Sequence, residues 1–332
     1  MASKKLRKIQ FGLETTAGTA VAATQIWRGL GTIQDDQDVR FADEDVGYLS
    51  GANRTYTASD GARLSLDSVE ATFEQLPVLL TCGIAEDTAG AADGEGSGYV
   101  YTFTAATNAA ATLSTLTIEG GDDQQAEEME YAFPERIRIS GAPGDALMMS
   151  ADFLGRQVAT TTFTGALSLP SVEEIIFSKG TLYIDTAGGT VGTTAKSSTL
   201  LGVDIDIGTG LVARRAANGE LYFDSVGQAG PDISVQLTYE HNSSAVSEIA
   251  AWRAETARQI QLKWEGSALT TAGDYSNKTF ILNMAGKYES FEPIDEMDGN
   301  DIVRCTFKPQ YDTTAELFFQ AIVVSSDDDP FS

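Results

Sequence analysis

The sequence predicts a mainly β protein with two short helices, built as tandem duplicated domains of the β-sandwich or β-barrel type. Three observations predict this fold class: segments of alternating apolar and polar residues, turn sequences rich in Gly, Asn and Asp between them, and an order of elements that occurs twice. Alternation is typical of strands with one buried and one solvated face. With 332 residues, 42% of them hydrophobic, the chain is long enough for two domains with real cores.

Alternating segments occur in both halves of the chain. In the first half they predict strands at 26–34, 62–67 and 115–118 and a hairpin at 136–154. In the second half they predict strands at 181–185, 203–207, 233–239 and 259–265 and a hairpin at 280–307. The long polar segments 34–59 and 208–228 are expected to be loops that form contact surfaces, because plain connections are shorter.

Two segments have apolar residues at helical spacing. The first begins near Ser68 and continues to Ile84, and Pro77 is expected to bend or split it. The second is expected to open on Ser243 or Ser244 as the N-cap residue, with an apolar face made of Val246, Ile249, Ala250 and Trp252.

Each half has the same order of elements: a strand, a long loop, a strand, a helix, a strand and a hairpin. Residues 64–66 and 235–237 hold matching places before the two helices. This order predicts a duplication with its boundary near 167–171. We therefore expect an N-terminal arm at 1–25, a first β domain at 26–168, a second at 169–325 and an acidic tail at 326–332.

The net charge disfavours several kinds of partner. The chain has 48 acidic and 22 basic side chains, a formal charge of −26, which repels nucleic acid and anionic membranes. The balance suits a surface that DNA passes without adsorbing, and the rival explanation is a host that lives at high salt. No apolar run typical of a signal peptide or a membrane span is present, so we expect synthesis in a cytoplasm and no membrane contact.

No residue pattern indicates catalysis, a cofactor or a metal centre. Cys82 and Cys305 are expected to be buried thiols, and His241, the only histidine, a surface residue at a helix entry. The acidic segments Asp87–Gly98 and Asp295–Asp301 do not fit a calcium loop, which leaves a weak cation site open at each. Carboxylate pairs for acid–base chemistry are not singled out among so many acids, and we expect no enzyme activity.

Two groups of charged residues are candidate contact residues. Asp204 and Asp206 alternate with apolar residues, so they lie on one strand face, which is either an ordinary solvated face or the lining of a channel. Lys4, Lys5, Arg7 and Lys8 concentrate positive charge at the N-terminus, which either pairs with the acidic body of another copy or is a solvated end. The long loops add residues that interfaces favour: Phe41, Tyr48, Tyr56, Arg214 and Arg215.

Three stretches together carry a resemblance to a known family. They are ETTAGTAVAAT at 14–24, SLDSVEATFEQLPVLLTCGI at 65–84 and FPERIRISGAPGDALMMSADFLGRQ at 133–157. The chain resembles the major tail tube proteins of long-tailed, non-contractile bacteriophages, in a duplicated two-domain form. The first half carries most of the resemblance, and the second half matches mainly by element order.

The resemblance implies a structural subunit of a virion. Three chains would form a pseudo-sixfold ring, strands of neighbouring copies would join into one continuous barrel, and stacked rings would make a tube through which DNA leaves the particle. The small residues of 10–24 would let an arm lie against a neighbouring subunit, and carboxylates such as Asp204 and Asp206 would line the lumen. A tape-measure protein and tail terminator or tip proteins are the implied partners. The alternative function is a non-enzymatic binding or adhesin-like β module of a particle surface.

Overall fold

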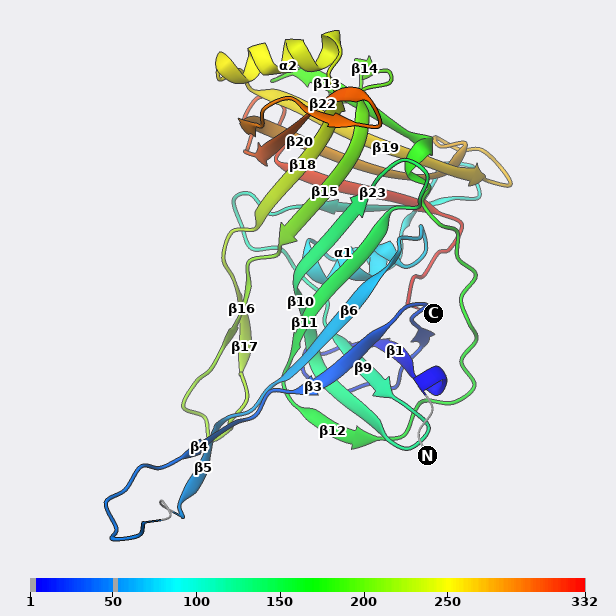
Figure 1. The fold of residues 1–332 in the computed structure, drawn as a ribbon. Helices are drawn as coiled ribbons and strands as arrows, with labels where there is room; N and C mark the ends of the chain where they lie inside the picture. The colour runs from blue at the N-terminus through cyan, green and yellow to red at the C-terminus, as the bar shows by residue number, and fades with distance from the viewer. Residues whose placement is uncertain (1–3, 50–52, 332) are drawn as a thin grey trace.

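The computed structural model describes residues 4–49 and 53–331, without the side chain of Lys4. It is mainly β, with a large antiparallel sheet and two α-helices, as the alternating sequence predicts (Figure 1). Neither helix in this part of the chain has the length and apolar character needed to cross a membrane. Both cysteines, Cys82 and Cys305, are buried as free thiols.

The strands of the first half cover those predicted there, except that the strand expected at 26–34 is divided into two strands, with residues 27–30 outside both. In chain order they are β1 (Lys8–Leu13), β2 (Gln25–Ile26), β3 (Gly31–Asp35), β4 (Asp38–Phe41), β5 (Thr55–Ser59), β6 (Ala62–Glu70), β7 (Ala91–Ala92), β8 (Tyr99–Thr104), β9 (Leu116–Gly121), β10 (Ala126–Gly141), β11 (Met148–Gly155) and β12 (Val158–Thr161). The helix α1 (Leu76–Gly83) follows β6.

The second half contains the remaining strands and the helix α2 (Ser243–Arg253). In chain order the strands are β13 (Gly180–Thr186), β14 (Ala195–Lys196), β15 (Leu200–Gly208), β16 (Leu211–Arg214), β17 (Ser225–Gln228), β18 (Asp232–Glu240), β19 (Arg258–Ala268), β20 (Asn277–Phe291), β21 (Asp295–Met297), β22 (Asn300–Pro309) and β23 (Phe319–Ser325). Two short 3-10 helices, at Lys4–Leu6 and Phe177–Lys179, complete the described structure.

Eight strands form one continuous antiparallel array in the order β3-β6-β11-β10-β15-β18-β22-β20. The ladder between β10 and β15 connects the two halves, with Ile137 opposite Ile207. Both β10 and β20 are long strands that also pair elsewhere: β10 with β9 and β12, and β20 with β19 and β23. The halves also interlock, because β8 of the first half pairs with β23 of the second.

The core lies on one face of this array. In β6, residues Ala62, Leu64 and Leu66 are buried while the residues between them are exposed, and β18 follows the same alternation. Every residue of α1 is buried, and Figure 1 shows this helix behind β6 and β10 of the array. The opposite face of the array is polar and solvated, so the array has one dry and one wet surface.

The first predicted helix begins too early. Residues Ser68–Glu70 continue β6, where Val69 and Glu70 lie opposite Met149 and Met148 of β11, so α1 starts only at Leu76. Strand pairing overrides the helical spacing there because it adds ladder hydrogen bonds and buries Val69. Pro77 neither bends nor splits α1: it lies in the first turn, where a missing N–H costs no hydrogen bond.

The second helix has a different cap and a different buried face from those predicted. Asn242 is the N-cap residue, and its side chain accepts hydrogen bonds from the N–H groups of Ser244 and Ala245. The buried positions are Ala245, Glu248 and Ala251, whereas Val246 and Ala250 are exposed. Ile249 and Trp252 do pack partly against the core.

The two long segments predicted as loops each form a hairpin, β4–β5 and β16–β17. Figure 1 shows the β4–β5 hairpin projecting far from the body at lower left, whereas β16–β17 runs alongside the first half. Cross-strand pairing lets such long segments satisfy their backbone groups without a core of their own.

The small-residue stretch at 10–24 packs within its own chain. Strand β1 pairs with β9 and β2, and Ile9 and Phe11 are buried. A Cβ at Gly12 would lie 2.5 Å from Ala22 O, and Gly18 has φ +76°, a conformation that favours glycine. Close approach and backbone conformation within the chain therefore account for Gly12 and Gly18, whereas Ala17, Ala20 and Ala22 are exposed.

Candidate functional site

The eight-strand array ends on one side at β3. Within the described residues, β3 pairs with β6 alone. Asp36 N donates to Gly61 O and Leu30 O accepts from Asp67 N, so every second residue of this segment turns its backbone groups towards β6. By the alternation of an antiparallel ladder, Ile33 and Asp35 turn their N–H and C=O groups outwards. This edge is a row of backbone groups ready to pair with another strand.

The array ends on the other side at the last residues of β20. Residues 286–291 pair with β22 in the part of the chain that the structure describes, and Glu292 N continues this ladder to Arg304 O. The ring of Phe291 contacts the indole ring of Trp252 in α2, with ring centroids 5.6 Å apart. Trp252 Nε1 donates to Glu289 O at 3.3 Å, so one indole ring covers part of this edge.

The predicted pair Asp204 and Asp206 lies on the wet face of β15, as the alternation indicates. The two carboxylates do not form an uninterrupted acidic wall, because cations of neighbouring strands lie among them. Asp206 accepts two hydrogen bonds from the guanidinium of Arg136, which lies on the adjacent β10. Other ion pairs on this face are Arg138–Asp152, Arg63–Asp36, Arg63–Glu135, Lys308–Asp232 and Arg304–Asp295.

The ion pair on β15 changes the protonation of its carboxylate. The hydrogen bonds and positive charge of Arg136 lower the pKa of Asp206, and partial burial only opposes that effect. Asp206 is therefore an anion with its own cation beside it. Several charges of the wet face are paired in this way, whereas Asp204 is exposed on the same strand.

The β4–β5 hairpin carries the apolar residues that the sequence marked as contact residues. Phe41 is 80% exposed, and Val39, Tyr48, Leu49 and Tyr56 are also exposed. Acidic residues outnumber basic ones along this hairpin, with six at 35–45 against Arg40 and Arg54. Large exposed aromatic side chains on a projecting hairpin indicate a contact surface. We call the described residues of this hairpin, 36–49 and 53–60, the arm; it is distinct from the N-terminal segment 1–25.

Arg214 and Arg215, the other predicted loop residues, have local partners. The C=O of Arg214 accepts from Asp224 N across β16–β17, and Arg215 Nη1 donates to Asp60 O at 2.9 Å, next to the arm. Arg215 thus connects the loop end of β16–β17 to the base of the β4–β5 hairpin.

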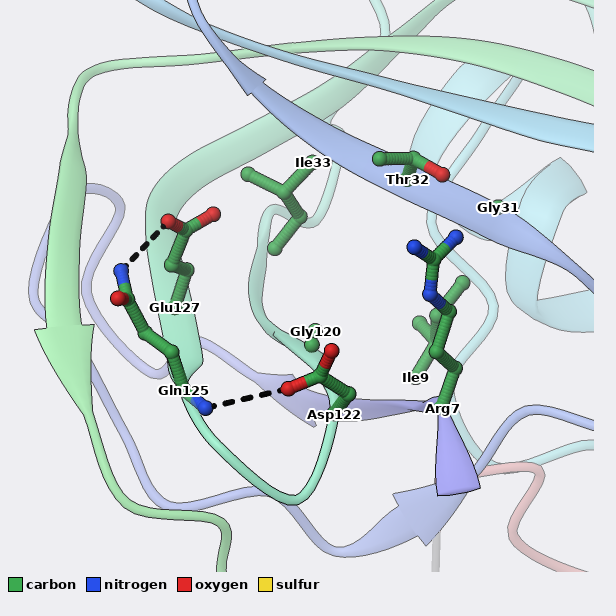
Figure 2. A pocket seen from close by; sticks show the side chains of 10 residues that line it. Arg7, Ile9, Gly31, Thr32, Ile33, Gly120, Asp122, Gln125 and Glu127 are labelled. Atoms are coloured by element: carbon green, nitrogen blue, oxygen red, sulfur yellow. Dashed lines mark hydrogen bonds between the residues drawn. The ribbon is translucent and has the colours of Figure 1, made fainter. Parts of the chain in front are cut away.

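The basic N-terminal residues line hollows beside the start of β3. Lys5, Arg7 and Lys8 line one of about 620 Å³ together with Leu30 and Asp67. A smaller one lies between β3 and the β9–β10 turn (Figure 2). Figure 2 shows the side chains of Arg7, Asp122 and Glu127 around it, with Gln125 bonded to Glu127. Both hollows combine cations with carboxylates, and neither gathers a nucleophile with a base.

The β16–β17 hairpin packs on the first half of the chain. Phe223 is 1% exposed and lies against Tyr131 and Phe133, with centroids 5.1 and 5.8 Å away. Arg156 fastens the hairpin by donating to Phe223 O and Asp224 O, while its guanidinium stacks on Tyr131. No sequence pattern predicted this contact, because it joins residues about 90 positions apart.

The acidic segments have structural roles. Asp93 is 1% exposed and accepts hydrogen bonds from the N–H groups of Asp274 and Tyr275, so it holds a loop of the second half. Asp295 pairs with Arg304. Residues 4–49 and 53–331 contain no group of three or more His, Cys, Asp or Glu side chains placed to hold a metal ion. His241 donates its N–H to Asp301 O and is partly exposed before α2.

The fold and these surfaces define a mainly β protein with a large antiparallel sheet, in which β3 has one unpaired side among the described residues and Trp252 covers part of the β20 edge. Comparison with protein-family models finds none that matches the chain, and no curated protein matches its sequence.

Proposed function

We propose that this protein is a structural subunit of a phage tail tube, a tandem duplication whose trimers form rings that stack into a hollow tube for DNA. The observation that carries the proposal is the order of strand pairing. The order β3-β6-β11-β10 in the first half has the same connectivity as β15-β18-β22-β20 in the second. Each helix follows the second strand of its set.

Register supports the duplication as well as order. Phe153 of β11 lies between Leu64 and Pro134, and Phe307 of β22 lies between Val235 and Tyr288. A bulge follows at the same place in each hairpin, after Pro134 and after Tyr288. The accompanying strands correspond too: β1-β9-β10-β12 has the connectivity of β13-β19-β20-β23.

The duplication supplies a way to close a ring. Inside one chain, the last strand of the first set, β10, pairs with the first strand of the second set, β15. The same relation between copies would pair β20 of one chain with β3 of the next, whose edges are open. By register, Phe291 would lie opposite Asp35, as Ile137 lies opposite Ile207. Repetition of one head-to-tail contact generates a ring where the rotation between copies closes, and the family resemblance implies closure with three chains.

The wet face of the array suits the lining of a DNA channel. The core covers the other face, so a closed array would turn this polar face inwards. Five cations of this face have carboxylate partners within 4 Å, which leaves them less able to bind phosphate groups by releasing counterions: Arg63, Arg136, Arg138, Arg304 and Lys308. DNA would then slide past without adsorbing. Tape-measure and tail terminator or tip proteins would be the partners in the virion.

A second candidate function is a binding or adhesin-like module. The exposed aromatic side chains of the arm favour it, since a monomer that displays them could bind another molecule with them. Such a module would remain monomeric or form discrete oligomers without a channel.

Negative-stain electron microscopy of the purified protein over a range of concentration and salt tests the proposal. We expect six-lobed rings or hollow tubes. Asp35→Pro should prevent rings, because it removes an outward N–H without removing a bond to β6, and Asp35→Ala is the control that keeps the N–H. Compact monomers at every concentration, with no tubes even after partner proteins are added, would favour the binding module.

A further inference from the structure

The two long hairpins hold corresponding places in the two halves. The arm, with β4–β5, connects β3 to β6, and β16–β17 connects β15 to β18. The strand register makes Ile33 of β3 equivalent to Ile205 of β15. Counting the same number of residues onward from each, Val39 and Phe41 are equivalent to Leu211 and Ala213. Leu211 is 5% exposed because β16–β17 packs on the first half, whereas Val39 and Phe41 are exposed.

The second half has an unfilled counterpart of the surface on which β16–β17 packs. In the first half, Arg156 fastens that hairpin and directly follows β11, donating its N–H to Glu130 O. In the second half, Gln310 directly follows β22 and donates its N–H to Ala285 O. Gln310 therefore holds the place of Arg156.

A hollow of about 310 Å³ lies at Gln310. It is lined by β19, β20 and the segment after β22, including Arg258, Gly286 and Tyr311. Gly286 is the counterpart of Ala132, because each occupies the same position in its ladder, opposite Arg258 and Leu116 respectively. In the first half, the neighbours of Ala132, Tyr131 and Phe133, contact Phe223 of the β16–β17 hairpin. Tyr311 of the hollow is 47% exposed.

We propose that the arm of one copy docks into this hollow of the next copy, as β16–β17 docks on the first half of its own chain. The inference deepens the proposed ring and rests on it. In that ring, β20 of one copy pairs with β3 of its neighbour, and the same contact brings the neighbour's arm to the hollow beside β20 of the first copy. Docking covers Phe41 and its exposed neighbours with Tyr311 and the segment around it.

Charge also favours this occupant. Asp36, Asp38 and the acidic residues at 43–45 make the arm negative. Lys287 lies opposite Lys308 across the β20–β22 ladder, next to Gly286 of the hollow. Lys308 already pairs with Asp232, so Lys287 is the cation that faces the arm's acids. Asp312 is an opposing charge in the lining, so we expect the arm's acids to meet the lysine side.

Thiol cross-linking in the full chain tests the docking. The variant pairs Phe41→Cys with Tyr311→Cys, while the native Cys82 and Cys305 are buried and do not compete. With a short bismaleimide, we expect covalent dimers and trimers on denaturing gels. The control Phe41→Cys with Val246→Cys, which is 50% exposed on α2, should give none. Phe41→Cys with Leu30→Cys probes the rival site in the basic hollow.

The possible outcomes distinguish failure of the docking inference from failure of the proposed function. Rings or tubes with a link to Tyr311 support the inference. Rings or tubes that link through Leu30, or that do not link, overturn the docking while the proposed function stands. A parent chain that remains monomeric and unlinked overturns both. As a second measurement, Phe41→Ser should weaken association by about tenfold or more without changing the circular dichroism spectrum, since its side chain is outside the core.

Discussion

Arg136 and Asp206 form a two-pronged ion pair across the ladder that joins the two halves of the chain. On the opposite face of this ladder, Ile137 and Ile207 are 0% and 1% exposed. One junction thus combines a solvated ion pair with buried apolar contact. The apolar side contributes more to the free energy of folding, because an exposed ion pair contributes little, whereas burial of an isoleucine side chain contributes substantially.

The double-mutant cycle of Arg136→Ala and Asp206→Asn should give a coupling free energy of at most about 1 kcal/mol at pH 7. The pKa of Asp206 is lowered by Arg136, so the coupling is present above the unfolded pKa near 3.9 and lost as the pH falls through the lower folded value. Urea unfolding of the four proteins from pH 7 to pH 2.5 measures it. A coupling that grows on acidification would contradict this assignment.

Assembly should change the fluorescence of one tryptophan. Trp27 and Trp264 are 3% and 1% exposed, while Trp252 is partly exposed at the open edge of β20. If β20 pairs with β3 of a neighbour, Trp252 loses contact with water, and we expect a blue shift and weaker acrylamide quenching as rings form. Trp252→Phe should abolish both changes. Tubes that form without any shift would place the subunit contact elsewhere.

Glu14→Gln should destabilise the protein by about 2–4 kcal/mol. Glu14 is 8% exposed and accepts hydrogen bonds from Gly18 N and Tyr131 N, both 2.7 Å, and from the hydroxyls of Thr115 and Thr117. An amide keeps one acceptor oxygen and turns its NH2 group towards the remaining donors, so either Gly18 N or Tyr131 N loses its acceptor. Urea unfolding measures the loss.

Glu95→Gln is the matched control for Glu14→Gln, because Glu95 is exposed in a turn and should change stability by less than about 0.5 kcal/mol. Equal effects of the two substitutions would mean that Glu14 does not hold the segment 14–18 in place.

Lys278→Met should cost about 2–4 kcal/mol, because it leaves the 3%-exposed carboxylate of Glu74 without its cation. Lys278 Nζ lies 2.6 Å from Glu74 and 3.4 Å from Glu173, so it ties β20 to the turn before α1. Lys263→Met is the control, since the Lys263–Glu265 pair is more exposed.

The pH dependence of the Lys278→Met effect has a definite sign. Burial lowers the pKa of Lys278, but the hydrogen bond and charge of Glu74 outweigh it, so the pKa is raised. The stabilisation is therefore complete below the unfolded pKa near 10.4 and is lost as the pH rises through the folded value. Urea midpoints of parent and variant should converge above about pH 10.5. A gap that stays constant to pH 11.5 would exclude this charge effect.

Periodicity predicted the strands and failed where pairing competes with it. The segment 233–239 is predicted as a strand because its residues alternate, and β18 covers it with one further residue at each end. Residues 68–70 have helical spacing but lie in β6, because β11 offers them a partner that the sequence does not reveal. The helix cap moved by one residue to Asn242, whose side chain reaches the first free N–H groups as well as a serine does.

The sequence allowed the candidate contact residues to be picked out by residue type, but it did not show which residues surround them in the fold. Phe41, Tyr48 and Tyr56 stood out as aromatic residues in a polar segment, and they are exposed on the arm. Asp204 and Asp206 were placed on one face correctly, but the cation beside Asp206 comes from residue 136, and local sequence does not show it. The open edges of β3 and β20 could not be foreseen, because an edge is defined by which strands fail to pair.

Alternation and composition were enough to predict a mainly β protein with two helices, the apolar and polar faces of most strands, and a sequence without a histidine or cysteine pattern typical of catalysis or metal binding. These properties depend on neighbours along the chain, which alternation and composition record directly. Which strands lie side by side, which charges are paired and which strand edges remain unpaired could be read only from the folded chain. Those properties depend on contacts between residues far apart in the chain, where pairing and burial select one arrangement among many with the same local pattern.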